Sequence, residues 1–325
     1  MIILSNDDVA RLLPMDAAIP VVSDIMKTVS RGTETLPLRT AIPVGGANKM
    51  GVMPGAITDP ACFGVKLVSL FPNNPSLGLS SHRGAIVLFE SETGGAIAMM
   101  DAGLLTAIRT AAASGVATDI LARKEASSLA LVGYGEQAEF HLDAICAVRP
   151  IETVEVVGRS AEKAAQFIAR AVQKYPNIRF CSGTDVEKAV KTADIICTVT
   201  ASPAPIIEGR WLTRGSHINA VGSSIPTMRE LDDEAILRSR VWVDYWPSAE
   251  AQAGEIVDMI KAGLITKDDI QGEIGAVLSG EINGRQDNDQ ITLYRSLGIA
   301  AQDLSVAHFV VTKAKENNMG QQVAF

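Results

Sequence analysis

Features that would point to metal binding, disulfide cross-linking or a membrane are scarce in this chain. Its 325 residues include 4 cysteines, and no two of them form a C-x-x-C pair. The 4 histidines are scattered without the paired spacing of metal ligands, so we expect no metal site. No apolar stretch reaches the length of a membrane span, and Met1–Ser5 is too short and uncharged to be a signal peptide. We therefore expect a cytoplasmic protein that has no membrane partner.

Positive charge is scarce as well. Lys and Arg number 29 against 37 Asp and Glu, which gives a formal net charge of −8. Non-specific binding of nucleic acid needs a basic face, so this class of partner is excluded. The chain also contains neither a P-loop nor a G-x-S-x-G nucleophile elbow. Its 27 glycines and 5% aromatic content are typical of an α/β enzyme with many turns.

The strongest positive signal lies within residues 128–160. An apolar run, Ser128–Val132, ends in the sequence Gly-Tyr-Gly-Glu-Gln-Ala, and a helical stretch and a second apolar run follow. This order of strand, glycine-rich turn, helix and strand predicts a dinucleotide-binding unit. Gly133 permits the tight turn, Gly135 lets the backbone approach a pyrophosphate, and Ala138 is the third small position. The helix N-terminus then supplies N–H groups and a positive dipole end to the phosphates.

The end of the second strand indicates which dinucleotide is bound. Units that bind NAD usually place Asp or Glu there, to accept a hydrogen bond from the ribose 2′-OH. This chain has Arg159 and Ser160 instead, a guanidinium and a hydroxyl that would hold a 2′-phosphate. We therefore predict NADPH, with NADH as a weaker substitute. The alternative is a loop arginine in a Rossmann-like domain that binds something else.

Further strands and helices continue the alternation after this unit. Strand candidates cover 177–181, 193–200, 216–221 and 240–244, and their spacing predicts a doubly wound parallel sheet. Because the turns after parallel strands face the ligand crevice, the predicted rim includes Gly158–Ser160, Thr200–Pro203 and Gly222–Ser224.

The first hundred residues predict a different architecture. Two helices (6–13 and 15–30) precede consecutive strand candidates, at 36–44, 51–53, 64–71, 84–90 and 96–101. Short turns between them indicate an antiparallel sheet in a separate α+β domain. A long helix at 104–124 leads into the dinucleotide unit, and a last helix at about 299–317 is expected to pack back on the first domain. We predict one domain of residues 1–115 with 299–325, and a Rossmann domain of residues 116–298.

Three basic residues lie in apolar surroundings. Arg39 interrupts an apolar run at 36–44, Lys66 interrupts another at 63–70, and Arg109 lies among alanines of the long helix. In a strand, alternation could equally point Arg39 or Lys66 to solvent. If all three converge, a ligand anion is required to balance them, because an unpaired buried cation is costly. A substrate carboxylate would suit this role, since Arg can bind one with two parallel hydrogen bonds.

Taken together, these segments resemble the ornithine cyclodeaminase/mu-crystallin family over nearly the whole chain. The segments that carry the resemblance are Leu36–Arg39, Gly51–Pro54, Gly64–Lys66, Asp101–Ala112, Val132–Ala138, Asn219–Pro226, Arg229–Leu231 and Gly298–Leu304. The stretch Leu-Thr-Ala-Ile-Arg-Thr-Ala-Ala, combined with the later Gly-x-Gly-x-x-Ala unit, is quite specific.

The resemblance implies a homodimer of two-domain subunits. The first domain and the last helix would form the dimer contact and bind the substrate, and the Rossmann domain would hold the nicotinamide cofactor. Arg39, Lys66 and Arg109 would surround the substrate carboxylate, with Ser224 as a further substrate contact. Lys66 is our candidate catalytic residue, although Lys66, Ser224 and a water molecule all stay open as the proton donor. The predicted cofactor contacts are Thr110, Gly133, Gly135, Glu136, Gln137, Ala138, Arg159, Ser160, Thr200, Ala201, Val221, Gly222 and Ser223.

Chemistry varies within the family, and two departures from its cyclodeaminases narrow the choice. Those enzymes carry an acidic residue in the turn where this chain has Ser223-Ser224, and they tend to end the second strand with an acidic residue rather than Arg159. The chain looks more like the ketimine reductase and Δ1-pyrroline-2-carboxylate reductase branch. We therefore predict NADPH-dependent reduction of a small cyclic imine carboxylate, Δ1-pyrroline-2-carboxylate or Δ1-piperideine-2-carboxylate, to proline or pipecolate. The alternatives are ornithine cyclodeamination with a recycled NAD, and a low-turnover NADPH-binding protein of the mu-crystallin type.

Overall fold

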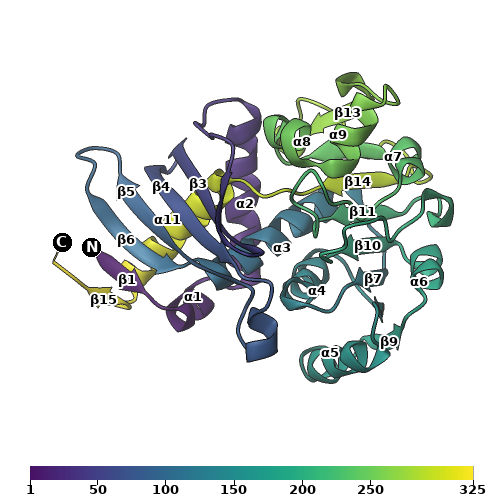
Figure 1. Cartoon of the computed structure of the whole chain (residues 1–325), viewed down its shortest axis with the longest axis horizontal. Coiled ribbons are helices and arrows are strands. Elements are labelled where there is room, and N and C mark those ends of the chain that lie inside the picture. The colour runs from purple at the N-terminus through teal and green to yellow at the C-terminus, as the bar shows by residue number, and fades with distance from the viewer. Residues whose placement is uncertain (325) are drawn as a thin grey trace. The chain divides into compact units, whose positions relative to one another are not determined.

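Two compact units make up the computed structural model, which describes residues 1–324 (Figure 1). Unit 1 contains residues 1–110 and the C-terminal segment from Gly298 onward, and unit 2 contains residues 111–297. The first boundary falls inside helix α3 (Ala102–Leu121), a few residues before the predicted position at 115.

Unit 1 is built on a seven-stranded sheet in the order β15-β1-β6-β5-β4-β3-β2. Its strands are β1 (Ile2–Leu4), β2 (Thr40–Gly45), β3 (Asn48–Thr58), β4 (Ala61–Leu70), β5 (His82–Glu90), β6 (Ala96–Asp101) and β15 (Gln321–Gln322). Among the described strands of this sheet only β1 and β6 pair in parallel, so the predicted antiparallel sheet is confirmed. Within this sheet the sequence did not predict β1 and β15, which are three and two residues long.

One helix from the end of the chain packs against this sheet. The helices of unit 1 are α1 (Asn6–Leu12), α2 (Met15–Ser30) and α11 (Ala300–Glu316), with a 3-10 turn at Asn74–Leu77. As predicted, α11 returns to the first domain, where it contacts α2, β3, β4 and β5. Gly55 and Gly64, paired across β3 and β4, allow this approach, because a Cβ at either position would lie 3.0 Å from a side chain of α11. The close approach decides which residues of α11 can reach β4.

Unit 2 is a parallel sheet of eight strands in the order β13-β12-β14-β11-β10-β7-β8-β9. The strands are β7 (Ser128–Val132), β8 (Thr153–Val157), β9 (Arg179–Gly183), β10 (Ile195–Thr198), β11 (His217–Ala220), β12 (Arg240–Val243), β13 (Ile270–Glu273) and β14 (Thr292–Arg295). The helices are α4 (Glu136–Val148), α5 (Ala161–Lys174), α6 (Val186–Thr192), α7 (Asp233–Arg238), α8 (Trp246–Gln252), α9 (Gly254–Lys261) and α10 (Ile274–Leu278), with 3-10 turns at Gly209–Trp211 and Lys267–Asp269.

This topology confirms the predicted doubly wound sheet and locates its switch point. The chain leaves β7 for β8 on one side and later returns to β10 on the other. In such sheets ligands bind outside the carboxyl ends of the strands at this reversal. The crevice is therefore formed by the turns after β7 and β10, with the turn after β8 beside them.

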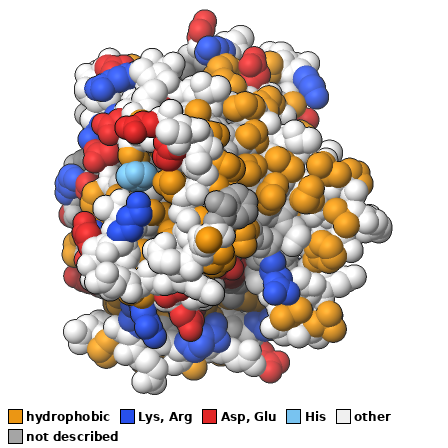
Figure 2. Space-filling model, turned by 90° about the vertical axis from the view of Figure 1, so that its left-hand side faces the viewer, with side chains coloured by type: hydrophobic (Ala, Val, Ile, Leu, Met, Phe, Trp, Pro, Cys, Tyr) orange, Lys and Arg blue, Asp and Glu red, His pale blue; other side chains and the backbone are white. Residues whose placement is uncertain are grey.

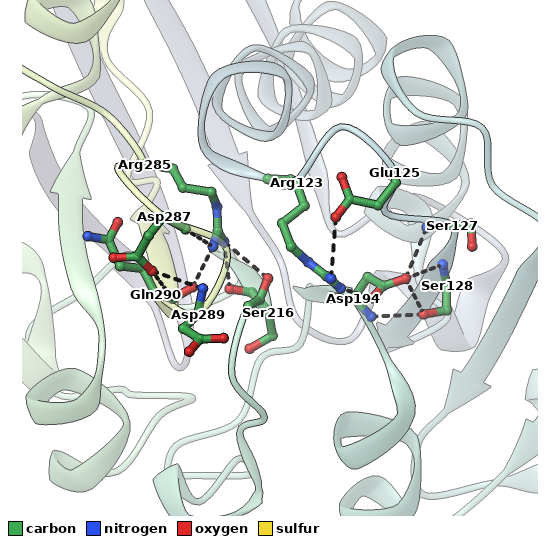
Figure 3. Close-up of polar contacts among 12 residues, drawn as sticks. Arg123, Glu125, Ser127, Ser128, Asp194, Ser216, Arg285, Asp287, Asp289 and Gln290 are labelled. Atoms are coloured by element: carbon green, nitrogen blue, oxygen red, sulfur yellow. Dashed lines mark hydrogen bonds and ion pairs between the residues drawn. The ribbon is translucent and has the colours of Figure 1, made fainter.

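The opposite edge of the same sheet is closed by a polar network (Figure 3). Asp194, just before β10, accepts hydrogen bonds from the backbone N–H groups of Ser127 and Ser128 at 3.0 and 3.1 Å and forms an ion pair with Arg123. Arg285 donates to the carbonyl of Ser216, just before β11, at 3.1 Å. These contacts satisfy the strand beginnings, so the amino edge is structural and the carboxyl edge is left for ligands.

Helix α3 qualifies one expectation from the sequence. Residues Ala102–Leu121 are long and apolar enough to cross a membrane, contrary to the expectation that no stretch would reach that length. However, 78% of this helix window is buried inside the protein, as is typical of a core helix.

Candidate active site

Lys66 lies on the covered face of β4. Side chains alternate along this strand, with Cys62 and Gly64 buried and Phe63 exposed, so Lys66 shares the inner face with the two buried residues. Only 2% of Lys66 is exposed. The alternative that alternation left open, a lysine pointing to solvent, is therefore wrong.

A buried carboxylate on α11 receives the Lys66 ammonium. Lys66 Nζ lies 2.8 Å from Asp303 Oδ2, and Arg109 Nε lies 2.8 Å from Asp303 Oδ1. Arg109 also donates from a terminal nitrogen to Gln302 Oε1 at 3.0 Å. Asp303 and Gln302 are both fully buried. One carboxylate thus binds two cations, and the adjacent amide orients the arginine.

Arg39 approaches the same cluster through Gly298. Its Nη2 donates to the Gly298 carbonyl at 3.4 Å. Gly298 has φ +75°, and a Cβ there would lie 2.4 Å from Arg109 Nη1, so only glycine leaves room for the guanidinium. The three predicted basic residues therefore do come together, all within unit 1.

Burial and neighbouring charges set the protonation of the cluster. Burial, the Arg109 charge and the Arg39 charge lower the pKa of Lys66 to about 7, although Asp303 opposes them. Burial alone would raise the pKa of Asp303, but Arg109 and Lys66 outweigh it and hold the pKa below its usual range. At neutral pH the carboxylate is charged, and the ammonium is close to its titration midpoint.

Asp303 overturns one step of the sequence argument. The sequence predicts a ligand anion that balances the buried cations, whereas the protein supplies a carboxylate of its own. The residue was missed even though its segment, Gly298–Leu304, belongs to those that carry the family resemblance. Nothing in the spacing connects it with Lys66, because 237 residues separate the two in the sequence.

The glycine-rich turn in unit 2 has the geometry of a dinucleotide site. Gly133 has φ +115°, and a Cβ there would meet the Val199 carbonyl at 2.9 Å, so the turns after β7 and β10 touch. At Gly135 a Cβ would meet nothing within 4 Å, which leaves its backbone open to a close ligand. Gly135 is also the N-cap of α4, and it has no side chain that could occupy the N–H groups of the first turn. Buried Ala138 packs in the core under this turn, while Glu136 and Gln137 begin α4. These residues fit a pyrophosphate.

Tyr134, which the sequence reasoning passed over, links this turn to the end of β8. Its ring covers Gly158, where a Cβ would lie 2.4 Å from Tyr134 Cε1. Its hydroxyl accepts a hydrogen bond from the Ser160 backbone N–H at 3.0 Å. The Ser160 hydroxyl caps α5 by accepting from Lys163 N at 3.3 Å, and Arg159 is exposed beside it. The turn after β8, which the sequence predicts to select the cofactor, is therefore held in place by the glycine-rich turn.

The other predicted contact residues of unit 2 lie in turns at the carboxyl edge of its sheet. Thr200 and Ala201 follow β10, and residues 221–224 follow β11. Ser223 is buried, and its hydroxyl donates to the Met228 carbonyl at 2.5 Å, whereas Ser224 is half-buried. Thr110 lies apart from these turns in the sequence, as a buried residue of α3.

The possible metal ligands and the cysteines were also located in the structure. Among residues 1–324 there is no group of three or more His, Cys, Asp or Glu side chains that could hold a metal ion. All 4 cysteines are free. Cys197 is buried, whereas Cys181 lies on the edge strand β9 and is exposed.

Comparison with known proteins places these features in context. The sequence model of the ornithine cyclodeaminase/mu-crystallin family matches residues 1–318. A Delta(1)-pyrroline-2-carboxylate reductase of Bacillus cereus is 33% identical over 327 residues, covering 100% of both chains. The solved structure of Thermococcus litoralis Delta(1)-pyrroline-2-carboxylate reductase with NADH and L-proline has a TM-score of 0.96 and 34% identity, covering 99% of this chain and 100% of that one. An archaeal alanine dehydrogenase dimer with bound NAD has a TM-score of 0.93 and 31% identity, covering 100% and 99%.

Proposed function

Because the chain belongs to the ornithine cyclodeaminase/mu-crystallin family, we propose that it reduces a small cyclic imine carboxylate with a nicotinamide cofactor. The substrate is Δ1-pyrroline-2-carboxylate or Δ1-piperideine-2-carboxylate, and the product is proline or pipecolate. The observation that carries the proposal is the cluster in unit 1, where Lys66 and Arg109 share the Asp303 carboxylate and Arg39 joins them through the Gly298 carbonyl. With Lys66 protonated, the excess positive charge attracts a second carboxylate, which is the group that the substrate brings.

The chemistry needs one hydride and one proton. The cofactor supplies the hydride to the imine carbon when it is bound, and the ring nitrogen takes the proton. Arg39 and Arg109 hold the substrate carboxylate, and this fixed orientation lowers the barrier. Lys66, with a pKa of about 7, is suited to give up a proton at neutral pH. Ser224 forms a further contact with the substrate.

NADPH is the proposed cofactor, with NADH as a weaker substitute. The support is the exposed guanidinium of Arg159 beside Ser160, the N-cap of α5, after the end of β8, where NAD enzymes usually have a carboxylate. The two solved relatives hold NADH and NAD, so a nicotinamide dinucleotide suits this fold, and the 2′-phosphate is the part to be tested.

Oligomeric state and location complete the proposal. Phe63 and Phe89 stack on the outer face of the unit 1 sheet with ring centroids 5.1 Å apart, and Phe63 and Met99 are 36% and 39% exposed. In Figure 2 hydrophobic side chains gather over much of the visible surface. Exposed apolar patches of this kind are typical of interfaces, so the proposed state is a homodimer.

The proposed location is the cytoplasm. Four unpaired cysteines agree with this reducing compartment.

The deciding experiment is a cofactor-oxidation assay with several substrates. Pyrroline-2-carboxylate and piperideine-2-carboxylate are each supplied with NADPH and, separately, with NADH, alongside pyruvate plus ammonia, and ornithine. We expect rapid oxidation with a cyclic imine, faster with NADPH. Replacing Arg109 with alanine should raise the KM for the imine about 10- to 100-fold, because a charge-assisted hydrogen bond is lost, while NADPH affinity stays near normal.

Other outcomes of this assay identify the alternatives. Ornithine consumption without net change of cofactor would indicate a cyclodeaminase, and activity only with pyruvate plus ammonia would indicate an alanine dehydrogenase. Cofactor binding without turnover of any substrate would favour a binding protein of the mu-crystallin type.

A further inference from the structure

A buried carboxylate, Glu230, lies at the carboxyl edge of the parallel sheet in unit 2. It is 1% exposed and belongs to the loop that precedes α7. Burial is costly for a carboxylate unless hydrogen bonds compensate it. The hydrogen bonds that Glu230 accepts therefore indicate which parts of the fold its carboxylate holds in place.

Both oxygens of Glu230 accept two hydrogen bonds. Oε1 accepts from the Thr200 backbone N–H at 2.8 Å and from the Thr200 hydroxyl at 2.7 Å. Oε2 accepts from the Thr198 hydroxyl at 2.8 Å and from the Gly222 backbone N–H at 2.7 Å. Four donors use the full accepting capacity of an ionised carboxylate. The donors come from the end of β10, the turn after β10 and the turn after β11.

The two turns are pressed together where Glu230 binds them. A Cβ at Gly222 would lie 2.0 Å from the Thr200 carbonyl oxygen and 2.7 Å from Glu230 Oε1. Gly222 is thus required for this approach. The backbone carbonyl of Glu230 also accepts from Ile206 N at 2.8 Å and Ile207 N at 3.1 Å, where the chain returns from the turn after β10. One residue therefore fixes both ends of the segment 200–206 and the start of the next turn.

Charge strengthens these bonds. Burial raises the pKa of Glu230, while the hydrogen bonds from Thr200 and Thr198 and the charge of Arg295 act in the opposite direction. Hydrogen bonds to an ionised acceptor are shorter and about twice as strong as neutral ones. The two backbone N–H bonds, at 2.8 Å from Thr200 and 2.7 Å from Gly222, are shorter than the usual N–H···O distance and agree with that class.

We infer that Glu230 is a positioning residue for the cofactor: its carboxylate holds the turns after β10 and β11 in the geometry that receives the nicotinamide half of the dinucleotide. This inference rests on the proposed function, because it requires that those turns face a bound cofactor. Glu230 does not touch substrate or cofactor itself, because its oxygens are fully occupied by the protein.

The test is direct cofactor binding, measured by NADPH fluorescence without any imine. Glu230→Gln keeps the shape, but its amide nitrogen faces N–H and O–H donors and cannot accept from them. We expect the Kd for NADPH to rise about tenfold or more, the effect of mispositioning one or two contacts. The KM for the imine at saturating cofactor should stay near the wild-type value.

A matched control separates positioning from general stability. Asp194→Asn alters the carboxylate clamp at the opposite edge of the same sheet, where Asp194 accepts from Ser127 and Ser128 (Figure 3). It should lower the unfolding temperature but leave the Kd for NADPH within about twofold of wild type. If Glu230→Gln loses stability without loss of affinity, the residue is merely structural and the inference is overturned.

Two further measurements allow a decision if Glu230→Gln does not fold or if the wild type binds no cofactor. If Glu230→Gln does not fold, Glu230→Asp retains the charge but is one methylene shorter, and an NADPH affinity equal to that of the wild type would overturn the inference. If the wild-type protein itself binds neither NADPH nor NADH, the inference and the proposed function fall together. Normal wild-type binding with no imine turnover would contradict the proposed function alone.

Discussion

At the scale of single residues, Asp303 governs the behaviour of its two cationic neighbours. A buried ammonium or guanidinium is costly without a partner, and removing one member of a buried pair is strongly destabilising. Asp303 also opposes the lowering of the Lys66 pKa that burial and Arg109 cause. Lys66 can therefore be partly protonated near neutral pH, which a general acid requires.

The pH profile of the reaction should show this coupling. If protonated Lys66 is needed, kcat falls as the pH rises through about 7, the pKa of Lys66. Asp303→Asn removes the charge that raises this pKa, so the fall should begin at a lower pH. The charged and titratable groups around Lys66 are Asp303, Arg109, Arg39 and His82.

His82 provides the internal check on this prediction. His82 lies at an exposed position, but desolvation by neighbouring atoms and the charge of Lys66 lower its pKa below the usual range, so it titrates on the acid side of the expected fall. The measurement is kcat against pH for the wild type, Asp303→Asn and His82→Gln. A fall that keeps its position in Asp303→Asn would exclude Lys66 as the group responsible.

The sequence could identify the cations of this cluster but not its geometry. Arg109 stood out because alanines surround it, whereas alternation alone gave two possible directions for Lys66 until the covered face of β4 was known. Asp303 could not be connected to either residue by spacing, since it lies on a helix from the far end of the chain. Turn residues such as Gly133 and Gly135 were predictable because their role depends on local backbone geometry.

At the scale of elements, the approach of α11 to β3 and β4 positions the cluster. Gly55 and Gly64 remove the side chains that would otherwise separate helix and sheet. Leu304 of α11 packs against both glycines, and Asp303 is its neighbour in the sequence. The distance between Asp303 and Lys66 therefore depends on the absence of a side chain at Gly55 and at Gly64.

Gly64→Ala should show how tightly this contact is made. The new Cβ would lie 2.3 Å from the Val87 carbonyl and 3.0 Å from Leu304 Cδ2, so strand or helix must move. We expect a loss of about 1–3 kcal/mol in the free energy of unfolding, typical of overpacking. Gly183→Ala is the control, because a Cβ there meets only one atom, at 3.9 Å. Equal unfolding free energies for the two variants in urea titrations would contradict the prediction.

The sequence did not predict β14, because its residues show no strand pattern of their own. β14 occupies the middle of the parallel sheet, between β11 and β12, yet it is four residues long and ends in Arg295. That arginine is buried through an ion pair with Glu255 at 2.7 Å, a compensation that no local pattern reveals. β7 and β8 were predicted correctly because they are apolar and flank a glycine-rich turn.

At the scale of the whole molecule, the exposed apolar residues of unit 1 bear on assembly. Phe63→Asp would place a charge in the proposed dimer contact, and a central aromatic residue often contributes about 2 kcal/mol or more to an interface. We expect the dimer Kd to rise about 30-fold or more. Leu264→Asp, at a 53% exposed position in unit 2, is the control. Sedimentation should give a dimer for the wild type and this control, and monomer for Phe63→Asp; a dimer in all three would rule out this face.

Unit 1 consists of two segments that are far apart in the sequence, and this determines the order in which the two units can fold during synthesis. Residues 111–297 are contiguous, so they can fold as soon as they leave the ribosome, whereas unit 1 lacks α11 and β15 until residues 300–322 have been translated. Until then Lys66 and Arg109 have no Asp303 beside them, and β1 has no β15 to pair with. The unit that carries the glycine-rich turn can thus form first, and the charged cluster is complete only once Asp303 has been translated.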